Sequence, residues 1–396
     1  MELLDWLIHG VFVAAALVCA WRFAPRHWPM WLRRLAVLAV ALRAVTCLLR
    51  ITVYYYYGNG DGLGYYRTGL IVSERLMSLH FPMYDSTSYW GTAFIVRLSG
   101  VVVTLTAGSM PAAFFVFAIF ALIGVLHLGD ALLRAFPGRD LRSTLQVLLL
   151  WPSIAFWPSG IGKDAVVLLA AGLLFHGVVV RRGFAQACQV AAGLGLALLI
   201  RPHIAVLLAS AIVAAELLDP KRWTAARTLR TATLFVVVAV VAGAALQSFS
   251  LDVDDPQAIQ SYVDARSGKT ATGRSAIGQL SGAGALMMAP INIFFRPFVW
   301  EIRNPLVLVA SLETLLFTGL ILRALPRLRA LVVRGRVSRF VRLAVCVTIA
   351  LTMLYGMYYA NLGILARQKI VVFVFALLLL GLAVSRPIAP QKKRKK

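Results

Sequence analysis

Residues 54–69, with the sequence YYYYGNGDGLGYYRTG, place one acid, Asp61, among glycines and tyrosines directly after an apolar stretch. Glycines at alternate positions around the acid allow close approach to the backbone. A carboxylate in that setting can take the proton from an attacking hydroxyl group, while aromatic rings stack on the faces of a sugar. Under this interpretation Asp61 is the catalytic base. The structural alternative is a turn acid beside a belt of tyrosines at the membrane surface.

Two interruptions of apolar sequence carry cations that suit phosphate. In FWPSGIGKDAVVLL, glycines precede Lys163 at an expected helix start, where free N–H groups and a lysine can hold an anion. The spacing is not that of a Walker A loop, and the alternative is that Lys163 and Asp164 cap the helix. In ALLIRPHIAVLL, Arg201 and His203 can clamp a phosphate and supply a proton. The alternative is that Arg201 reaches lipid headgroups from a simple turn.

Two further interruptions add cations later in the chain. The stretch FFRPFVWEIRNP holds Arg296 and Glu301 among aromatic residues, and YYANLGILARQKIVVF places Arg367 and Lys369 before the last apolar run. The structural alternatives are an aromatic belt with an Arg–Glu pair, and snorkelling of the last two cations. Together the four interruptions predict cations gathered at one level of one bundle, where arginine matches phosphate in a two-pronged geometry. His203 and Glu301 would orient groups or share protons there.

These residues need membrane-spanning helices to position them. The 396-residue chain is 60% hydrophobic and only 14% charged, with a mean hydropathy of +0.80, so it lacks the polar surface of a soluble protein. Runs that are apolar on every face exclude a barrel of alternating strands. We expect an all-α fold, a single polytopic helical bundle over residues 1–396 with about eleven or twelve spans. The eleven expected spans are 4–22, 35–57, 111–133, 143–157, 164–180, 185–200, 204–218, 229–248, 304–322, 340–358 and 370–385.

Basic residues decide the expected sidedness of these spans. Most of the 40 Lys and Arg fall in short segments between apolar runs and in the tail 386–396, which the positive-inside rule assigns to the cytoplasm. The chain is expected in the inner (plasma) membrane with a cytoplasmic C-terminus and two larger outer loops, 58–91 and 249–303. Segment 91–108 is interpreted as re-entrant or surface-lying on the outer side, because a crossing would move later basic loops outside. Twelve spans are the alternative.

Other function classes fit the composition poorly. The net charge of +24 does not indicate a nucleic-acid partner, because the bases lie in loops beside apolar runs and meet anionic membrane lipids there. The four cysteines lie in or beside apolar runs without CxxC spacing, so we interpret them as small packing residues. No cofactor and no metal-binding set is indicated, although a divalent metal is compatible with the acid.

The arrangement resembles the GT-C class of membrane glycosyltransferases, which use polyprenyl-phosphate sugars at the outer membrane face. Their pattern is an acid in the first large outer loop, followed by a bundle with cationic outer helix ends, and Asp61 in GNGDGLGYYRTG matches that acid. The strings FWPSGIGKDAVVL, RPFVWEIRNP and NLGILARQK also resemble membrane proteins of bacterial exopolysaccharide clusters. The chain departs from the pattern twice, since its acid follows the second expected helix and GDGLG offers no paired acid.

The resemblance implies an inverting hexosyl- or pentosyltransferase in cell-surface polysaccharide assembly. It would move a sugar from a polyprenyl-phosphate-linked donor to a glycan or glycolipid acceptor, with Asp61 as the base. The residues expected to hold phosphate are Lys163, Arg201, Arg296, Arg367 and Lys369. Two alternatives stay open: a Wzy-like polymerase or ligase that joins lipid-diphosphate-linked glycans without Asp61, and a transporter or flippase of an anionic lipid-linked substrate.

Overall fold

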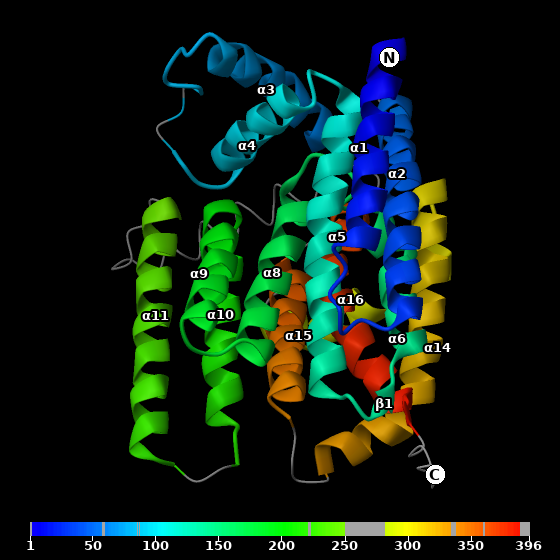
Figure 1. The fold of residues 1–396 in the computed structure, drawn as a ribbon. Coiled ribbons are helices and arrows are strands. Elements are labelled where there is room, and N and C mark those ends of the chain that lie inside the picture. The colour runs from blue at the N-terminus through cyan, green and yellow to red at the C-terminus, as the bar shows by residue number, and fades with distance from the viewer. Residues whose placement is uncertain are drawn as a thin grey trace, which may run out of the picture.

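The protein is an all-helical bundle, seen in a computed structural model that describes residues 2–57, 60–84, 86, 88–220, 223–249, 282–333, 338–358 and 361–388 (Figure 1). Within these ranges, nine helices are long and apolar enough to cross a membrane. They are α1 (Leu3–Arg22), α2 (Met30–Tyr57), α5 (Met110–Ala135), α8 (Lys163–Val180), α9 (Gly183–Ile200), α11 (Ala225–Phe249), α14 (Pro305–Val333), α15 (Arg339–Tyr358) and α16 (Leu362–Val384). The prediction of a polytopic helical membrane protein is confirmed.

Two expected spans are not single helices of membrane length. The segment 143–157 is divided into α6 (Arg142–Leu150) and α7 (Pro152–Phe156), and the segment 204–218 is the 16-residue helix α10 (Pro202–Leu217). The division falls at Trp151, which is extended with φ −61° and ψ 124°. The cause is Pro152, because a proline ring disfavours helical geometry at the residue before it.

The expected loops at one end of the bundle also contain helices. The expected loop 58–91 contains α3 (Asp61–Met77), and the segment 91–108 contains α4 (Thr92–Leu105), which packs along α3 (Figure 1). With 14 residues, α4 is about 21 Å long and too short to cross a bilayer core of about 30 Å. In the expected loop 249–303, α13 (Gly282–Phe295) and the short 3₁₀ helix η1 (Val299–Glu301) are described, whereas 250–281 lie outside the described residues.

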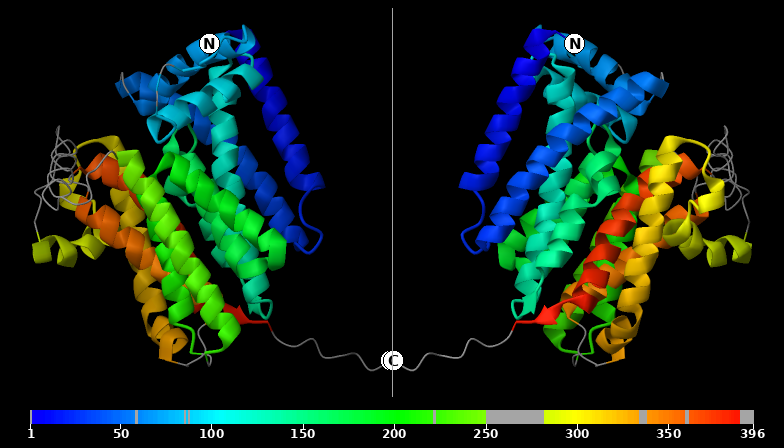
Figure 2. Two further views of the ribbon diagram at one scale, coloured as in Figure 1. Left: turned by 90° about the vertical axis from the view of Figure 1, so that its left-hand side faces the viewer. Right: turned by 90° about the vertical axis from the view of Figure 1, so that its right-hand side faces the viewer.

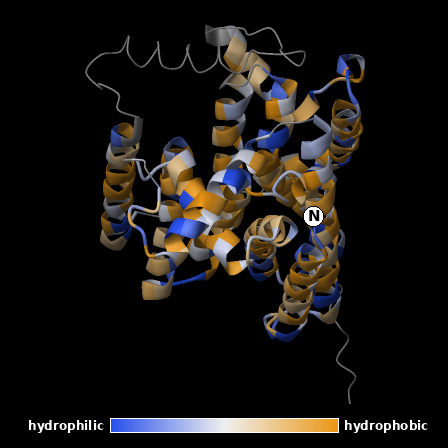
Figure 3. Ribbon diagram, turned by 90° about the horizontal axis from the view of Figure 1, so that it is seen from above, coloured by the Kyte–Doolittle hydropathy of each residue, from blue (hydrophilic) through white to orange (hydrophobic). Residues whose placement is uncertain are grey.

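The opposite end of the bundle carries a short two-stranded sheet. Strand β1 (Arg139–Asp140) pairs antiparallel with β2 (Arg386–Pro387), directly after the end of α16. We call this the β1 end, and the end that carries α3 and α4 the α3 end. The side views place α1 and α2 on one flank and α11 and α15 on the other (Figure 2). Seen from the α3 end, hydrophobic residues predominate on the upright helices (Figure 3), as expected where helices meet lipid.

A carboxylate fixes the helices at the β1 end. Asp130 of α5 accepts hydrogen bonds from the indole Nε1 of Trp28 at 2.6 Å and from Nε of Arg134 at 2.9 Å. Its oxygens also contact Nε2 of His27 at 2.5 Å and Nε2 of His176 at 2.9 Å. His27 and Trp28 join the α1–α2 connection to α5, and His176 joins α8 to it, whereas Arg134 lies on α5 itself. No spacing pattern in the sequence indicated this cluster.

Helices α5 and α8 pack with their backbones almost in contact. A Cβ on Gly124 would lie 2.1 Å from the carbonyl oxygen of Leu168, and a Cβ on Gly172 would lie 2.2 Å from that of Gly124. Membrane helices associate through such close packing, because apolar burial supplies little driving force between helices in lipid. The contact holds α8 in place against α5, and α8 begins at the α3 end with Lys163 and Asp164.

Gly124→Ala is expected to lower the melting temperature of the detergent-solubilised protein by several degrees. The added methyl group forces α5 and α8 apart, and such overpacking costs about 1–3 kcal/mol. The matched control is Gly195→Ala in α9, where nothing lies within 4 Å of the added carbon. Both changes raise helix propensity alike, so thermal unfolding followed by circular dichroism isolates the packing effect. Equal melting temperatures for the two variants would contradict the close contact.

Candidate functional site

Arg367 lies between two carboxylates at the α3 end of the bundle. Its Nη1 donates to Oδ2 of Asp61 at 3.0 Å, and its Nε donates to Oδ2 of Asp164. The side chain of Asp164 is 3% exposed, whereas that of Asp61 is 61% exposed. Arg367 is positioned by the first turns of α16, where the side chain of Asn361 caps the N–H groups of Gly363 and Ile364. The expected approach of Asp61 and Arg367 is therefore present in the structure.

Arg201 reaches the same buried carboxylate from the break between α9 and α10. Its Nη2 donates to Oδ1 of Asp164 at 2.9 Å, and its Nη1 donates to Oε1 of Gln368 and to the hydroxyl of Tyr355. The break is local in origin, because Pro202 disfavours helical geometry at Arg201, which has φ −145° and ψ 84°. The interruption places a buried guanidinium at the helix ends. We call Asp61, Asp164, Arg201 and Arg367 the Asp164 cluster.

Asp164 is a member of this cluster that the sequence interpretation left out of the site. The sequence pattern predicts it only as an acid that caps a helix, and α8 does begin at Lys163 after Gly162. Its two carboxylate oxygens, however, are bound by two guanidiniums rather than by the helix start. The helix dipole of α8 adds favourable interaction with the negative charge. The sequence does contain a signal for Asp164 as a site residue, because this acid directly follows Lys163 at an interruption of an apolar helix.

Asp61 owes its position to the glycines around it. Asp61 opens α3, and the preceding Gly60 has φ +152°, a conformation that side chains rarely adopt. A Cβ on Gly60 would lie 2.2 Å from the ring of Tyr54, and a Cβ on Gly62 would lie 2.8 Å from it. The absence of a side chain at Gly60 and Gly62 therefore leaves the space that the ring of Tyr54 occupies. Nearby, burial raises the pKa of the Tyr65 phenol and the charge of Asp61 raises it further, so Tyr65 remains a hydrogen-bond donor.

A third arginine adjoins the cluster from α2. Arg50 is 4% exposed, and its Nη2 donates to the hydroxyl of Tyr54 at 2.9 Å. Its guanidinium lies 4.4 Å from the ring centroid of Tyr54, 4.6 Å from that of Trp157 and 5.2 Å from that of Phe156. These contacts are cation–π interactions, which stabilise a desolvated cation without neutralising it. The end of the bundle therefore holds more positive charge than the two carboxylates balance.

Lys163 and His203 flank the Asp164 cluster. The Nζ of Lys163 donates to Oγ1 of Thr92 at 3.0 Å, which ties the start of α8 to the start of α4. The N–H of Gly91, just before α4, donates to the carbonyl of Leu199 at 2.7 Å. His203 is half-buried in the first turn of α10, two residues after Arg201. Both predicted residues thus lie at the α3 end, within two positions of Asp164 or Arg201 in the chain.

The other three predicted residues form a separate group, which we call the Lys369 cluster. The Nη2 of Arg296 lies 2.7 Å from Oε1 of Glu301, which confirms the Arg–Glu pair considered as the structural alternative. The fully buried Lys369 donates to the carbonyl of Arg296 at 3.0 Å and to Oγ1 of Thr314 at 2.9 Å. Lys369 follows Arg367 by two residues on α16, a rotation of about 200° that turns it to another face of the helix. The predicted cations therefore divide into two groups.

No known protein family, curated protein or solved structure matches the chain. The likeness to GT-C glycosyltransferases therefore rests on the sequence motifs alone, and the chemistry must be argued from the two clusters. The Asp164 cluster combines a buried, fully paired carboxylate with an exposed one on the same guanidinium. Arginines in such a setting can exchange an exposed carboxylate for a phosphate, because both ligands present paired oxygens.

Asp164→Asn is expected to destabilise the protein far more than Asp61→Asn. The first change leaves two buried guanidiniums without their shared carboxylate, and removing one partner of a buried pair costs about 3–5 kcal/mol. The second breaks a pair whose carboxylate faces solvent, and such pairs contribute about 0–1 kcal/mol. Both substitutions remove one negative charge from the same guanidinium, so each serves as control for the other. Similar losses of melting temperature in detergent would show that Asp164 does not organise the cluster.

Proposed function

We propose that the protein is a membrane glycosyltransferase that moves a sugar from a polyprenyl-phosphate-linked donor to a glycan or glycolipid acceptor at the outer membrane face. The observation that supports this most is Arg367, which bridges the buried Asp164 and the exposed Asp61. It joins a phosphate-binding group to a candidate base in one site. The positive-inside rule supports the outer assignment, because the basic connecting segments belong to the opposite end of the bundle.

The Asp164 cluster would bind the phosphate of the donor. Arg367 is held in place by Asp164, which Arg201 binds in turn, so the guanidinium of Arg367 is oriented before the substrate arrives. A phosphate that approaches from the α3 end competes with Asp61 for Nη1 of Arg367. The buried carboxylate stays bound, whereas the exposed one is released. Lys163 lies at the N-terminus of α8, where the helix dipole favours an anion.

The released Asp61 would then act as the general base. It takes the proton from the acceptor hydroxyl while that oxygen forms a bond to the anomeric carbon of the donor sugar. The bond from this carbon to the phosphate oxygen breaks, and its electron pair remains on the phosphate, where the arginines stabilise the added charge. A single displacement of this kind inverts the configuration at the sugar carbon. The products are the glycosylated acceptor and polyprenyl phosphate, which account for all the atoms and charges of the reactants.

A second candidate is a Wzy-like polymerase or ligase that joins lipid-diphosphate-linked glycans. The observation that favours it is the ion pair of Asp61 with Arg367 at 3.0 Å, because the Asp61 carboxylate in this contact orients the guanidinium. In this reaction the arginines hold the diphosphate and Asp61 only positions Arg367. The two candidates therefore differ in what the loss of the Asp61 carboxylate does.

Asp61→Asn is expected to reduce donor turnover at least a hundredfold, because general-base catalysis contributes about 10²–10⁴ in rate. The assay measures the release of polyprenyl phosphate from polyprenyl-phosphate sugars by membranes that contain the full chain. The matched control is Glu74→Gln, which removes an exposed carboxylate from the same helix α3 and should leave the rate unchanged. Glycan polymerisation that persists in Asp61→Asn but is lost in Arg367→Gln would favour the second candidate and exclude the first.

A further inference from the structure

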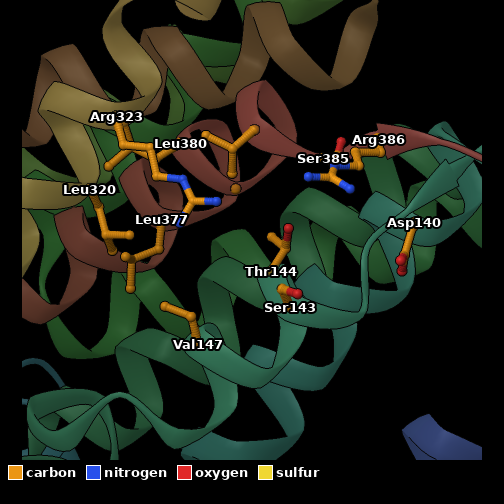
Figure 4. Close-up of a pocket in the computed structure, with 12 residues that line it drawn as sticks. Asp140, Ser143, Thr144, Val147, Leu320, Arg323, Leu377, Leu380, Ser385 and Arg386 are labelled. Carbon is orange, nitrogen blue, oxygen red and sulfur yellow. The ribbon is translucent and has the colours of Figure 1, made fainter.

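A cavity of about 380 Å³ lies at the β1 end, far along the bundle from the Asp164 cluster. It is lined by residues of α6, α14, α16 and the β1–β2 pair (Figure 4). The polar part of its lining holds the guanidinium groups of Arg323 and Arg386 and the hydroxyl groups of Ser143 and Thr144. Small-molecule sites occupy about 300–1,000 Å³, so the cavity has room for a ligand.

The fold fixes the polar part of the cavity from three sides. Arg386 lies in β2, opposite Asp140 of β1, and the preceding carbonyl of Ser385 accepts a hydrogen bond from Nη1 of Arg139 at 2.9 Å. Gly381 brings α16 against α6, because a Cβ there would lie 2.2 Å from Cγ2 of Thr144. Arg323 comes from α14, which packs against α16. The position of Arg386 is therefore set by backbone pairing and not only by side-chain packing.

The two guanidiniums face one another from opposite sides of the cavity in Figure 4. In the part of the chain that the structure describes, neither has a carboxylate within ion-pair distance. The one acid in the lining, Asp140, accepts the backbone N–H of Arg142 at 3.1 Å through Oδ1. Both arginines are exposed, and two cations turned toward the same space attract an anion, which arginine binds through phosphate oxygens in a two-pronged geometry.

The rest of the lining is apolar and belongs to the partly or fully buried faces of α6, α14 and α16. It includes Val147 of α6 and Leu320 of α14, and Leu377 and Leu380 of α16. A free inorganic anion gains nothing from contact with this apolar surface. A phospholipid, in contrast, would place its phosphate between the arginines and an acyl chain along the leucines. The β1 end also carries the basic connections of the bundle, which the positive-inside rule places beside the anionic cytoplasmic leaflet.

We propose that this cavity is a binding site for an anionic phospholipid, with the phosphate held by Arg323 and Arg386. The hydroxyl groups of Ser143 and Thr144 donate to the remaining phosphate oxygens, and Val147 and Leu377 contact the acyl chain. The site lies at the end opposite the Asp164 cluster and does not depend on the function proposed for that cluster. A bound lipid would join α14 to α16 and to the β1–β2 pair.

The first test compares the purified full-length chain with Arg323→Gln/Arg386→Gln for binding of phosphatidylglycerol, with phosphatidylcholine as the neutral lipid, by native mass spectrometry. The double variant is expected to weaken phosphatidylglycerol binding about thirtyfold, because each basic side chain near the surface contributes about fivefold. The matched control is Arg142→Gln/Arg327→Gln, which removes the same charge from α6 and α14 outside the cavity lining. Equal losses in both pairs, or equal binding of both lipids by the unaltered chain, would overturn the proposal.

The second test separates a lipid from a free phosphate and keeps all charges in place. Val147→Phe narrows the apolar part of the cavity and is expected to weaken phosphatidylglycerol binding severalfold, with the guanidiniums untouched. Inorganic phosphate is expected to displace the lipid only at concentrations far above those of the lipid. Unchanged lipid binding by Val147→Phe, together with displacement by inorganic phosphate at equal concentration, would identify a phosphate site without a lipid and overturn the proposal.

Discussion

The site depends on one interaction, the binding of the buried Asp164 carboxylate by Arg201 and Arg367. A lone charge among apolar helices would be expelled or neutralised, so the acid and the two cations must be buried together. The three residues come from the start of α8, the break between α9 and α10, and the first turns of α16. The pairing therefore fixes the relative position of three chain segments that packing of apolar side chains alone would specify poorly.

The same pairing sets what the α3 end can bind. Asp164 occupies part of each guanidinium, and Asp61 occupies another part of Arg367 from an exposed position. Arg50 adds a buried charge that lies against aromatic rings and donates to a tyrosine hydroxyl. An anion that arrives from outside can displace Asp61 without disturbing the buried pair. This separation of a permanent partner from an exchangeable one gives the site both a stable frame and a group that can be released.

The sequence predicted the class of fold and the end of the bundle at which Asp61 and Arg367 meet, because hydropathy and the placement of charges are local properties. It did not identify the partner that joins Arg201 to Arg367, since Asp164 is separated from Arg367 by 203 positions and looked like a helix cap. Helix periodicity alone predicts that Lys369 and Arg367 belong to different sites, because residues two positions apart on a helix point to different faces. The cluster around Asp130 follows from packing between distant segments, which no local pattern records.

Direct measurement of phosphate binding at the α3 end tests the central claim most directly. The dissociation constant of a polyprenyl phosphate would be measured for the purified chain, for Arg367→Gln and for Arg67→Gln, which removes an exposed cation from α3 at the same end. We expect Arg367→Gln to weaken binding at least tenfold, as for the loss of a charge-assisted hydrogen bond of about 1.5–3 kcal/mol. Arg67→Gln should change the dissociation constant little. Equal dissociation constants for all three proteins would contradict a phosphate site built on the Asp164 cluster.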